Sequence, residues 1–451
     1  MKLIALSICC VFLTLALGHA EVRLNEFLTA TSIPLEGMTG EAQDWIELYN
    51  AGDASVNLEG YLLTDSNDVL LADAGTYWQF PAATIAPDEY LIVLASGVDA
   101  LAEPAFLQAT FRLNRNGERL ALLRPNATTI VSELSPTYPE QRSEVSYGVD
   151  SKGIWKFQTR PTPGKPNSSS VEGFVSEVSF SVRHGFYDVP FTVELTSASE
   201  NAQIIFTTDG REPSLGSIFS GVIGNTYEGP IEINTTTVLR AKAFQNNRKS
   251  SVHRTQTYIF LDDVLHQPKL PEGFPSKWGA RPTDYEMDPE IVGETYPEEE
   301  VKKALLSLPT ISLVTDNDNL FASDGIYTNS QAKDNANDGI EDLWERPVSV
   351  EMMGFPHGQT VQANAGIRMQ GNASRNPNRV KHNMRLVFRS HYGPSKLRFR
   401  LFEDSEVDTF NSINLRSNNG DSWINPGVRT RAQYIRDQWH RVVQRDMRQP
   451  N

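Results

Sequence analysis

The residues best suited to chemistry lie in the last third of the chain, where a short polar turn is followed by basic strands. The segment Gly371-Asn372-Ala373-Ser374-Arg375 follows an expected strand, and a small turn of this kind can direct backbone N–H groups at phosphate oxygens. Lys381 and Arg385 are an even number of residues apart on the next expected strand, so their side chains share a face. Arg416 and Arg436 could complete a basic pocket. The candidate phosphate-binding residues are therefore Gly371, Asn372, Ser374, Arg375, Lys381, Arg385, Arg416 and Arg436.

The charge of this region suits an anionic ligand but does not demand one. The whole chain has 41 Lys and Arg against 56 Asp and Glu, a net charge of -15, which argues against nucleic-acid binding. From Gly366 to Asn451, by contrast, there are 16 Lys and Arg and only 7 Asp and Glu. Such a block fits phosphates or an acidic partner, and equally fits a basic face that complements acidic neighbouring domains. The turn itself is neither a Walker A loop nor a kinase glycine loop, so a plain hairpin turn between solvated basic strands is the alternative.

Phosphoryl transfer also needs carboxylates that hold a metal ion and an acid that positions the acceptor. The stretch Asp316-Asn-Asp-Asn319 lacks the glycine and the final glutamate of a calcium loop, and is expected to be a turn after a strand. Asp437 and Asp446 are expected to pair with arginines on a helix surface. We therefore assign no catalytic residue and no metal ligand in these 451 residues.

The segments around these residues read as strands separated by polar loops. The expected strands are Thr310–Thr315, Val348–Met353, Ala365–Gln370, Met384–Phe388 and Ser412–Arg416, followed by a helix over Arg429–Met447. A Pro- and acid-rich connector precedes them, with a short helix capped by Thr295 or Tyr296 and Pro297 at its first position. A domain of this size would leave strands without partners, so we expect a truncated domain.

Two segments nearer the N-terminus indicate small β-sandwiches. Residues 22 to about 166 alternate short apolar runs with Gly, Asn, Asp and Pro turns. The Pro-, Gly- and Ser-rich stretch 161–170 is typical of a linker. Residues 174 to about 260 repeat the strand-and-turn pattern over a length that fits one further sandwich.

The first twenty residues have the pattern of an export signal. Lys2 is followed by an almost wholly apolar run from Leu3 to Leu17, and Gly18-His19-Ala20 offers small residues at a cleavage site. We expect cleavage near Ala20 and a secreted or extracytoplasmic protein, in the periplasm, at the cell surface or in the medium. The only cysteines, Cys9 and Cys10, lie inside this signal, so the mature domains must be held by packing alone. No later stretch reaches membrane-spanning length.

Residues 21–166 resemble a lamin tail domain, an immunoglobulin-like sandwich. The resemblance is carried by Arg23-Leu-Asn-Glu-Phe27, Asp44-Trp-Ile-Glu-Leu-Tyr-Asn50, Leu58-Glu-Gly-Tyr-Leu-Leu-Thr-Asp65 and Thr162-Pro-Gly-Lys-Pro-Asn167. The apolar filling is expected from Trp45, Ile46, Leu48, Leu62 and Leu63. Asn25, Glu26 and Glu47 lie beside it, and we expect them to hold strand ends and turns together rather than to bind a ligand.

Residues 174–261 resemble the fibronectin-like module at the C-terminus of chitobiase and hexosaminidase enzymes. The matching text is Ile204-Ile-Phe-Thr-Thr-Asp-Gly-Arg-Glu-Pro213, Tyr227-Glu-Gly-Pro-Ile231 and Thr236-Thr-Val-Leu-Arg-Ala-Lys-Ala243. Such modules are usually spacers or accessory units, and no catalytic set is visible here. We therefore expect no glycosidase activity.

Residues 310–451 resemble the N-terminal half of the spore-coat protein H (CotH) kinase family of secreted atypical kinases. The matching text is Leu343-Trp-Glu-Arg-Pro347, Gly366-Ile-Arg-Met-Gln-Gly-Asn-Ala-Ser-Arg375, Lys381-His-Asn-Met-Arg-Leu386, Phe410-Asn-Ser-Ile-Asn-Leu-Arg416 and Tyr434-Ile-Arg-Asp-Gln438. This resemblance implies ATP and a divalent metal such as Mg²⁺ as cofactors, with Lys381 contacting phosphate. His382 stands where the family often has a second Lys, which departs from the pattern. The acids that the family uses for metal binding and catalysis would follow this segment.

The expected fold is a multidomain, mainly β chain: two sandwiches followed by an incomplete α/β (α+β) kinase-like domain. The expected segments are a signal peptide 1–20, a lamin tail domain 21–166, a linker 167–173, a chitobiase-like module 174–261, a connector 262–309 and a kinase-like part 310–451. Two functions compete, and carbohydrate binding by the sandwiches is a third for which no exposed aromatic platform is identified. One of the two is an exported kinase-like protein, inactive as this chain alone, acting on a protein or cell-surface substrate. The other is a non-enzymatic surface adhesion or scaffold protein with a degenerate kinase-like domain. The sequence does not define the oligomeric state.

Overall fold

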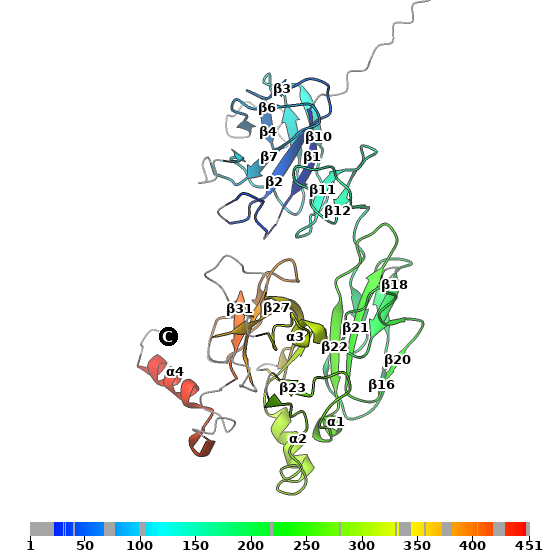
Figure 1. Cartoon of the computed structure of the whole chain (residues 1–451), viewed down its shortest axis with the longest axis vertical. Helices are drawn as coiled ribbons and strands as arrows, with labels where there is room; N and C mark the ends of the chain where they lie inside the picture. Colours follow the sequence, from blue (N-terminus) through cyan, green and yellow to red (C-terminus); the bar gives the residue numbers. More distant parts are fainter. Residues whose placement is uncertain are drawn as a thin grey trace, which may run out of the picture. The chain divides into compact units, whose positions relative to one another are not determined.

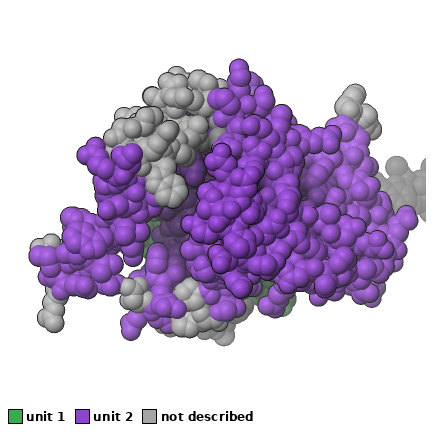
Figure 2. Space-filling model, turned by 90° about the horizontal axis from the view of Figure 1, so that it is seen from below, with its two compact units in different colours: residues 1–172 green, residues 173–451 purple. Residues whose placement is uncertain are grey.

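The computed structural model divides the chain into two compact units, residues 1–172 and 173–451 (Figures 1 and 2). It describes residues 22–29, 31, 33–38, 41–66, 77–98, 105–216, 220–278, 281–329, 332, 344–355, 358–371, 381–403, 405–417 and 429–447. The expected signal peptide therefore lies outside the described residues. The chain is mainly β, as expected, and no helix among the described residues is long and apolar enough to cross a membrane.

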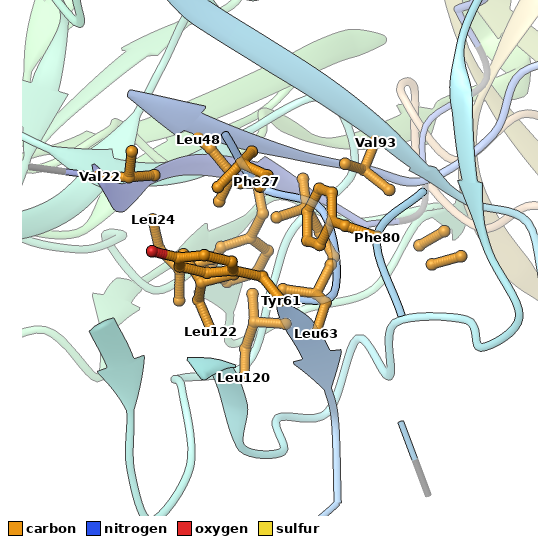
Figure 3. Packing of buried hydrophobic residues seen from close by; sticks show 14 of the residues in the cluster. Val22, Leu24, Phe27, Leu48, Tyr61, Leu63, Phe80, Val93, Leu120 and Leu122 are labelled. Carbon is orange, nitrogen blue, oxygen red and sulfur yellow. The ribbon is translucent and has the colours of Figure 1, made fainter. Parts of the chain in front are cut away.

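Unit 1 is a β-sandwich of two main sheets. The larger sheet has the order β13 (Ser170–Val171), β12 (Trp155–Gln158), β11 (Ser146–Val149), β1 (Val22–Leu28), β2 (Trp45–Asn50), β7 (Tyr90–Ala95) and β8 (Leu107–Ala109). The smaller sheet has the order β10 (Ile130–Leu134), β9 (Leu120–Leu123), β4 (Leu62–Thr64) and β5 (Trp78–Gln79), and β3 (Val56–Asn57) pairs with β6 (Thr84–Ile85). Phe27, Leu48, Leu63 and Leu122 fill the space between the sheets (Figure 3).

The expected filling of this sandwich is divided between the two faces of its sheets. Ile46, Leu48 and Leu63 belong to the main core. Trp45 lies instead with Leu28 and Leu94 in a separate cluster, and Leu62 packs with Ala121 and Leu123. The reason is the two-residue period of a strand, which sends adjacent side chains to opposite faces.

The first sheet of unit 2 belongs to a second sandwich. Its order is β15 (Gly185–Phe186), β22 (Arg254–Ile259), β21 (Thr237–Phe244), β18 (Gln203–Thr207) and β19 (Asn225–Thr226). Two strand pairs accompany it, namely β14 (Val178–Phe180) with β17 (Leu195–Ser197) and β16 (Phe191–Val193) with β20 (Ile231–Ile233). The core of this module contains Val193, Leu239, Ala241 and Tyr258.

A connector with two short helices joins this sandwich to the last sheet. It contains α1 (Leu261–Leu265), the pair β23 (Lys277–Trp278) and β24 (Arg281–Pro282), and α2 (Glu298–Leu306). The α2 helix is the expected one, but Pro297 occupies its N-cap position and the helix begins at Glu298. Three glutamates fill its first turn, where they interact favourably with the helix dipole.

The last sheet has the order β25 (Thr310–Val314), β26 (Arg346–Met353), β27 (Val361–Gln370), β28 (Asn383–Val387) and β31 (Ser412–Leu415). All four pairings are antiparallel, which is the α+β rather than the parallel α/β arrangement. The pair β29 (Leu397–Arg398) and β30 (Thr409–Phe410) and the helices α3 (Asn317–Phe321) and α4 (Arg436–Asp446) complete the described part. The closing helix is shorter than expected, because Arg429–Arg431 form a 3₁₀ turn before it.

Candidate functional site

The last sheet has one apolar and one polar face. Val350, Ala365, Ile367 and Leu386 lie in the buried core on one side. The strand register places Glu351, Asn364, Gly366, Arg368 and Arg385 on the other. An antiparallel sheet of this kind can present a polar face to water or to a binding partner. The candidate site lies on this polar face.

A buried ion cluster occupies one part of the polar face. The Glu345 carboxylate is 2.5 Å from Arg368 Nε and 3.2 Å from Arg389 Nε. The Glu345 and Arg368 side chains are only 1% and 5% exposed. Charges this far from water persist only when they are paired, so Glu345 fixes the position of both guanidinium groups.

Gly366 is required where it stands, because it lies under Glu345. A Cβ at Gly366 would be 2.6 Å from Glu345 Cδ and Oε1, closer than atoms can approach. Glycine within a strand often marks such a close approach. Glu345 and Gly366 both lie in the motifs quoted above, but the motif alone does not reveal that they are in contact. A glycine in the middle of a ten-residue strand is the signal that could have found it.

The strand register brings three of the predicted site residues to one end of this sheet. Gly371, with φ of +84°, directly follows β27. Gln370 pairs with Asn383, and Met384 pairs with Leu415. Lys381 therefore precedes β28 and Arg416 follows β31 at the same end of the sheet, and both side chains are exposed. The Asn383 Oδ1 accepts a 2.8 Å hydrogen bond from Ser417 N, which fastens this edge.

Arg385 lies deeper on the polar face, opposite Arg368 in the strand register. It is half-buried, and its Nη2 donates a 3.3 Å hydrogen bond to Ser412 Oγ. Lys381 is not part of β28, since the strand begins only at Asn383. The expectation that Lys381 and Arg385 stand on one strand is therefore wrong by two residues.

The remaining predicted residues are not brought to this edge by strand pairing. Arg436 is the first residue of α4 and is exposed, and its guanidinium donates to the Arg431 carbonyl. Asn372, Ser374 and Arg375 lie outside the described residues. The described part of the predicted set is thus Gly371, Lys381, Arg385 and Arg416 near one another, with Arg436 on a separate helix.

His382, which departs from the kinase pattern, points inward rather than toward solvent. It is buried and stacks on Tyr327, with ring centroids 4.3 Å apart and planes inclined by 16°. Burial raises the pKa of the Tyr327 hydroxyl to about 12. Of the neighbouring residues Lys381 and His382, it is therefore Lys381 that places a positive charge at the exposed edge.

The described residues do not form a metal centre. No group of three or more His, Cys, Asp or Glu side chains in the described ranges is arranged to hold a metal ion. Asp316, which the sequence placed in a turn, is the N-cap residue of α3, and its Oδ1 accepts from Arg240 Nη1 at 2.9 Å. That carboxylate is committed to a structural contact.

In unit 1 a second polar cluster holds the segment that was expected to be a linker. Glu47 Oε2 accepts from Gly164 N at 2.5 Å, and Glu26 accepts from the Thr162 amide at 3.1 Å. Asn167 donates to the Asn25 and Val149 carbonyls at 3.2 and 2.9 Å. We call residues 159–169 the strap. The strap is bonded to the outer face of the larger sheet, so Glu26 and Glu47 serve structure here.

The two strap-binding carboxylates are buried on neighbouring strands, where Glu26 lies opposite Glu47. Burial raises the pKa of Glu26, and it raises the pKa of Glu47 to about 8. Hydrogen bonds from Gly164 and Asn25 oppose this effect at Glu47, and the negative charge of Glu26 adds to it. Desolvation is the dominant cause.

Comparison with known proteins finds a family match in each of the two N-terminal modules. The family model of the Lamin Tail Domain matches residues 19–137, and that of the chitobiase/beta-hexosaminidase C-terminal domain matches residues 182–255. No curated protein matches the chain. Both family matches end before the last sheet, so the polar face and its basic edge lie outside the matched segments. The chain thus carries two β-sandwich modules that are similar to a lamin tail domain and to a chitobiase C-terminal domain, and both suggest binding or scaffold roles.

Proposed function

We propose that this protein is an exported, multidomain surface protein whose last domain binds the phosphates of a nucleotide at the basic edge of its sheet. The two matched modules act as localisation or binding modules. The observation that carries the proposal is the convergence of Gly371, Lys381 and Arg416 at one end of the sheet, with Arg385 behind them.

The residues at this edge fit a phosphate group. Gly371 has a left-handed backbone conformation, which allows the close backbone approach that phosphate cradles use. Lys381, Arg385 and Arg416 supply positive charge, and the nearby Glu345 is neutralised by its own arginines. A divalent metal is not supported in the same way, because the described residues offer no carboxylate cluster to hold it. When bound, ATP would supply a transferable phosphoryl group, and this chain would only bind and orient it.

Resemblance to the N-terminal half of a CotH kinase supports a kinase-like parent protein. Catalysis would need carboxylates beyond those assigned here, so the chain by itself is proposed to bind and not to turn over. The competing proposal is a non-enzymatic scaffold with a degenerate kinase-like domain. It is favoured by the binding or scaffold character of both matched modules.

ATP titration of the full chain, with and without Mg²⁺, separates the two proposals. We expect measurable affinity in the wild type and a loss of about 1.5–3 kcal/mol, or at least tenfold, in Lys381→Ala. Lys396→Ala is the matched control, because Lys396 is an exposed lysine of the same domain. The absence of ATP affinity, or equal affinity in all three proteins, would remove the phosphate site and leave the scaffold. Export is tested separately by the mass of the mature protein, which should begin at Glu21.

A further inference from the structure

The second sandwich has an outward-facing surface that is nevertheless buried. Leu239, Ala241 and Tyr258 point into its own core. By strand alternation Arg240, Thr255 and Thr257 point away from that core, yet they are only 3%, 0% and 6% exposed. Polar side chains on the outside of an isolated module would be solvated, so another part of unit 2 covers this face.

The covering surface is the polar face of the last sheet. Strand β26 alternates apolar and polar residues, which by itself predicts a solvated side with Ser349 and Glu351. Both residues are fully buried. Contacts between β22 and β26 join the two sheets, and Figure 1 shows β22 next to the last sheet, of which β27 is labelled.

Glu351 is the centre of this contact. Its Oε1 accepts a 2.9 Å hydrogen bond from Thr257 N and lies 3.3 Å from His184 Nδ1. Its Oε2 accepts from the Thr257 hydroxyl, which also lies 3.0 Å from Ser312 Oγ. The groups that satisfy this buried carboxylate therefore come largely from the chitobiase-like module.

A second contact joins the partly exposed Asp316 to Arg240, whose side chain is buried. The Asp316 Oδ1 accepts from Arg240 Nη1 at 2.9 Å and from Glu212 N at 2.8 Å. Arg240 Nη1 also donates to the Gly210 carbonyl at 2.7 Å. Gly210 and Glu212 belong to the turn by which the chitobiase-like module is recognised, so this turn receives the last domain. A third bond joins Asn364 Nδ2 to the His253 carbonyl at 3.0 Å.

We infer that the chitobiase-like module is the permanent second layer of the last domain, and that the two sheets form one cooperative folding unit joined at Glu351 and Asp316. The physical reason is desolvation. A buried carboxylate costs several kcal/mol unless donors satisfy it, and the donors of Glu351 would be lost if the modules separated. A mere spacer would leave both faces solvated and independent.

This arrangement also limits where a ligand can bind on the last sheet. The sandwich covers β25, β26 and the part of β27 around Asn364 through the contacts above. Arg385 and the edge near Lys381 and Arg416 belong instead to β28 and β31, at the other end of the strand order from β25. The two modules also jointly line a polar cleft of about 440 Å³ that includes Arg183, Gln256 and Gln362. The inference itself does not depend on the proposed phosphate site.

Hydrogen exchange of the full chain tests this inference with a matched pair of variants. Thr257→Val removes the hydroxyl that donates to Glu351. Thr255→Val is the same change on the same face of β22, at a hydroxyl with no hydrogen-bond partner among the described residues. We expect Thr257→Val to speed exchange at least fivefold in both β21–β22 and β25–β27, and Thr255→Val to change neither sheet. Faster exchange confined to one sheet, or equal effects of the two variants, would overturn the inference.

Cutting the connector gives an independent test. A protease site inserted between Glu272 and Gly273 lies in an exposed stretch flanked by Leu270 and Phe274, which are 49% and 43% exposed. After cleavage of the full chain we expect the two pieces to elute together on size exclusion and to separate in denaturant. We also expect Thr257→Val to weaken their association. Pieces that separate under native conditions would show that the module is a spacer.

Discussion

Substitution of Glu345 by Gln should destabilise the last sheet far more than any exposed charge change. The variant keeps the volume of the side chain but removes the charge that faces Arg368 Nε at 2.5 Å and Arg389 Nε at 3.2 Å. Breaking a buried pair costs about 3–5 kcal/mol, because the remaining charge stays buried. The amide oxygen of Gln can still accept from one guanidinium group, so we expect about 3 kcal/mol.

Local hydrogen exchange is the appropriate assay for this variant, because a chain of several modules does not unfold in one two-state transition. A loss of about 3 kcal/mol corresponds to roughly 100-fold faster exchange of the protected amides in β26, β27 and β28. Asp324→Asn is the control. Asp324 is 80% exposed and lies 3.7 Å from Arg346 Nη2, and such surface pairs contribute about 0–1 kcal/mol. Equal exchange in the two variants would refute the claim that Glu345 holds the polar face together.

Two further predictions concern single positions in each unit. Gly366→Ala should lower the stability of the last sheet by about 1–3 kcal/mol, because the new Cβ would overlap the Glu345 carboxylate. The control is Gly229→Ala, where nothing lies within 4 Å of the added Cβ. Equal hydrogen exchange in β27 for the two variants would contradict the packing argument. In unit 1 the pKa of Glu47 is about 8 in the folded state, above the ordinary value of 4.5, so the unfolded chain loses this proton first. The stabilisation of unit 1 by protonated Glu47 is therefore complete below about pH 4.5. It is lost as the pH rises through 8, and the loss is at most about 5 kcal/mol. Hydrogen exchange of the β1 and β2 amides, corrected for intrinsic rates, should reveal this decrease of stability with pH. Glu47→Gln should make the stability less dependent on pH. An unchanged pH dependence would assign the titration to another group.

Local sequence signals were sufficient to place most strands. The expected strands Thr310–Thr315, Val348–Met353 and Met384–Phe388 correspond to β25, β26 and β28, because strand alternation and turn residues act over a few positions. The same signals also identified the two modules that the family comparison supports. They correctly indicated that Trp45 and Leu62 are buried. They did not show that these two side chains pack outside the main core, since an apolar residue on a strand can be buried on either face once both faces are covered.

The candidate site was only partly predictable for a similar reason. The sequence indicated Gly371, Lys381, Arg385 and Arg416 as a basic set, and the register of β27, β28 and β31 brings them to one end of the sheet. It did not indicate Glu345, whose partners are 23 and 44 positions later in the chain. Arg436 was included on charge alone, and the structure places it on α4.

The sequence by itself determined the β-rich character of the chain, its two N-terminal modules and the polarity of each strand face. The tertiary structure decided which of those polar faces would lose contact with water. Ser349 and Glu351 look like a solvated side of β26, and only the docking of β22, about 90 residues earlier in the chain, buries them. The strap shows the same dependence, because Glu26 and Glu47 are satisfied by amides near residue 163. Periodicity is encoded locally, whereas the donors that satisfy a buried charge come from wherever the fold places them.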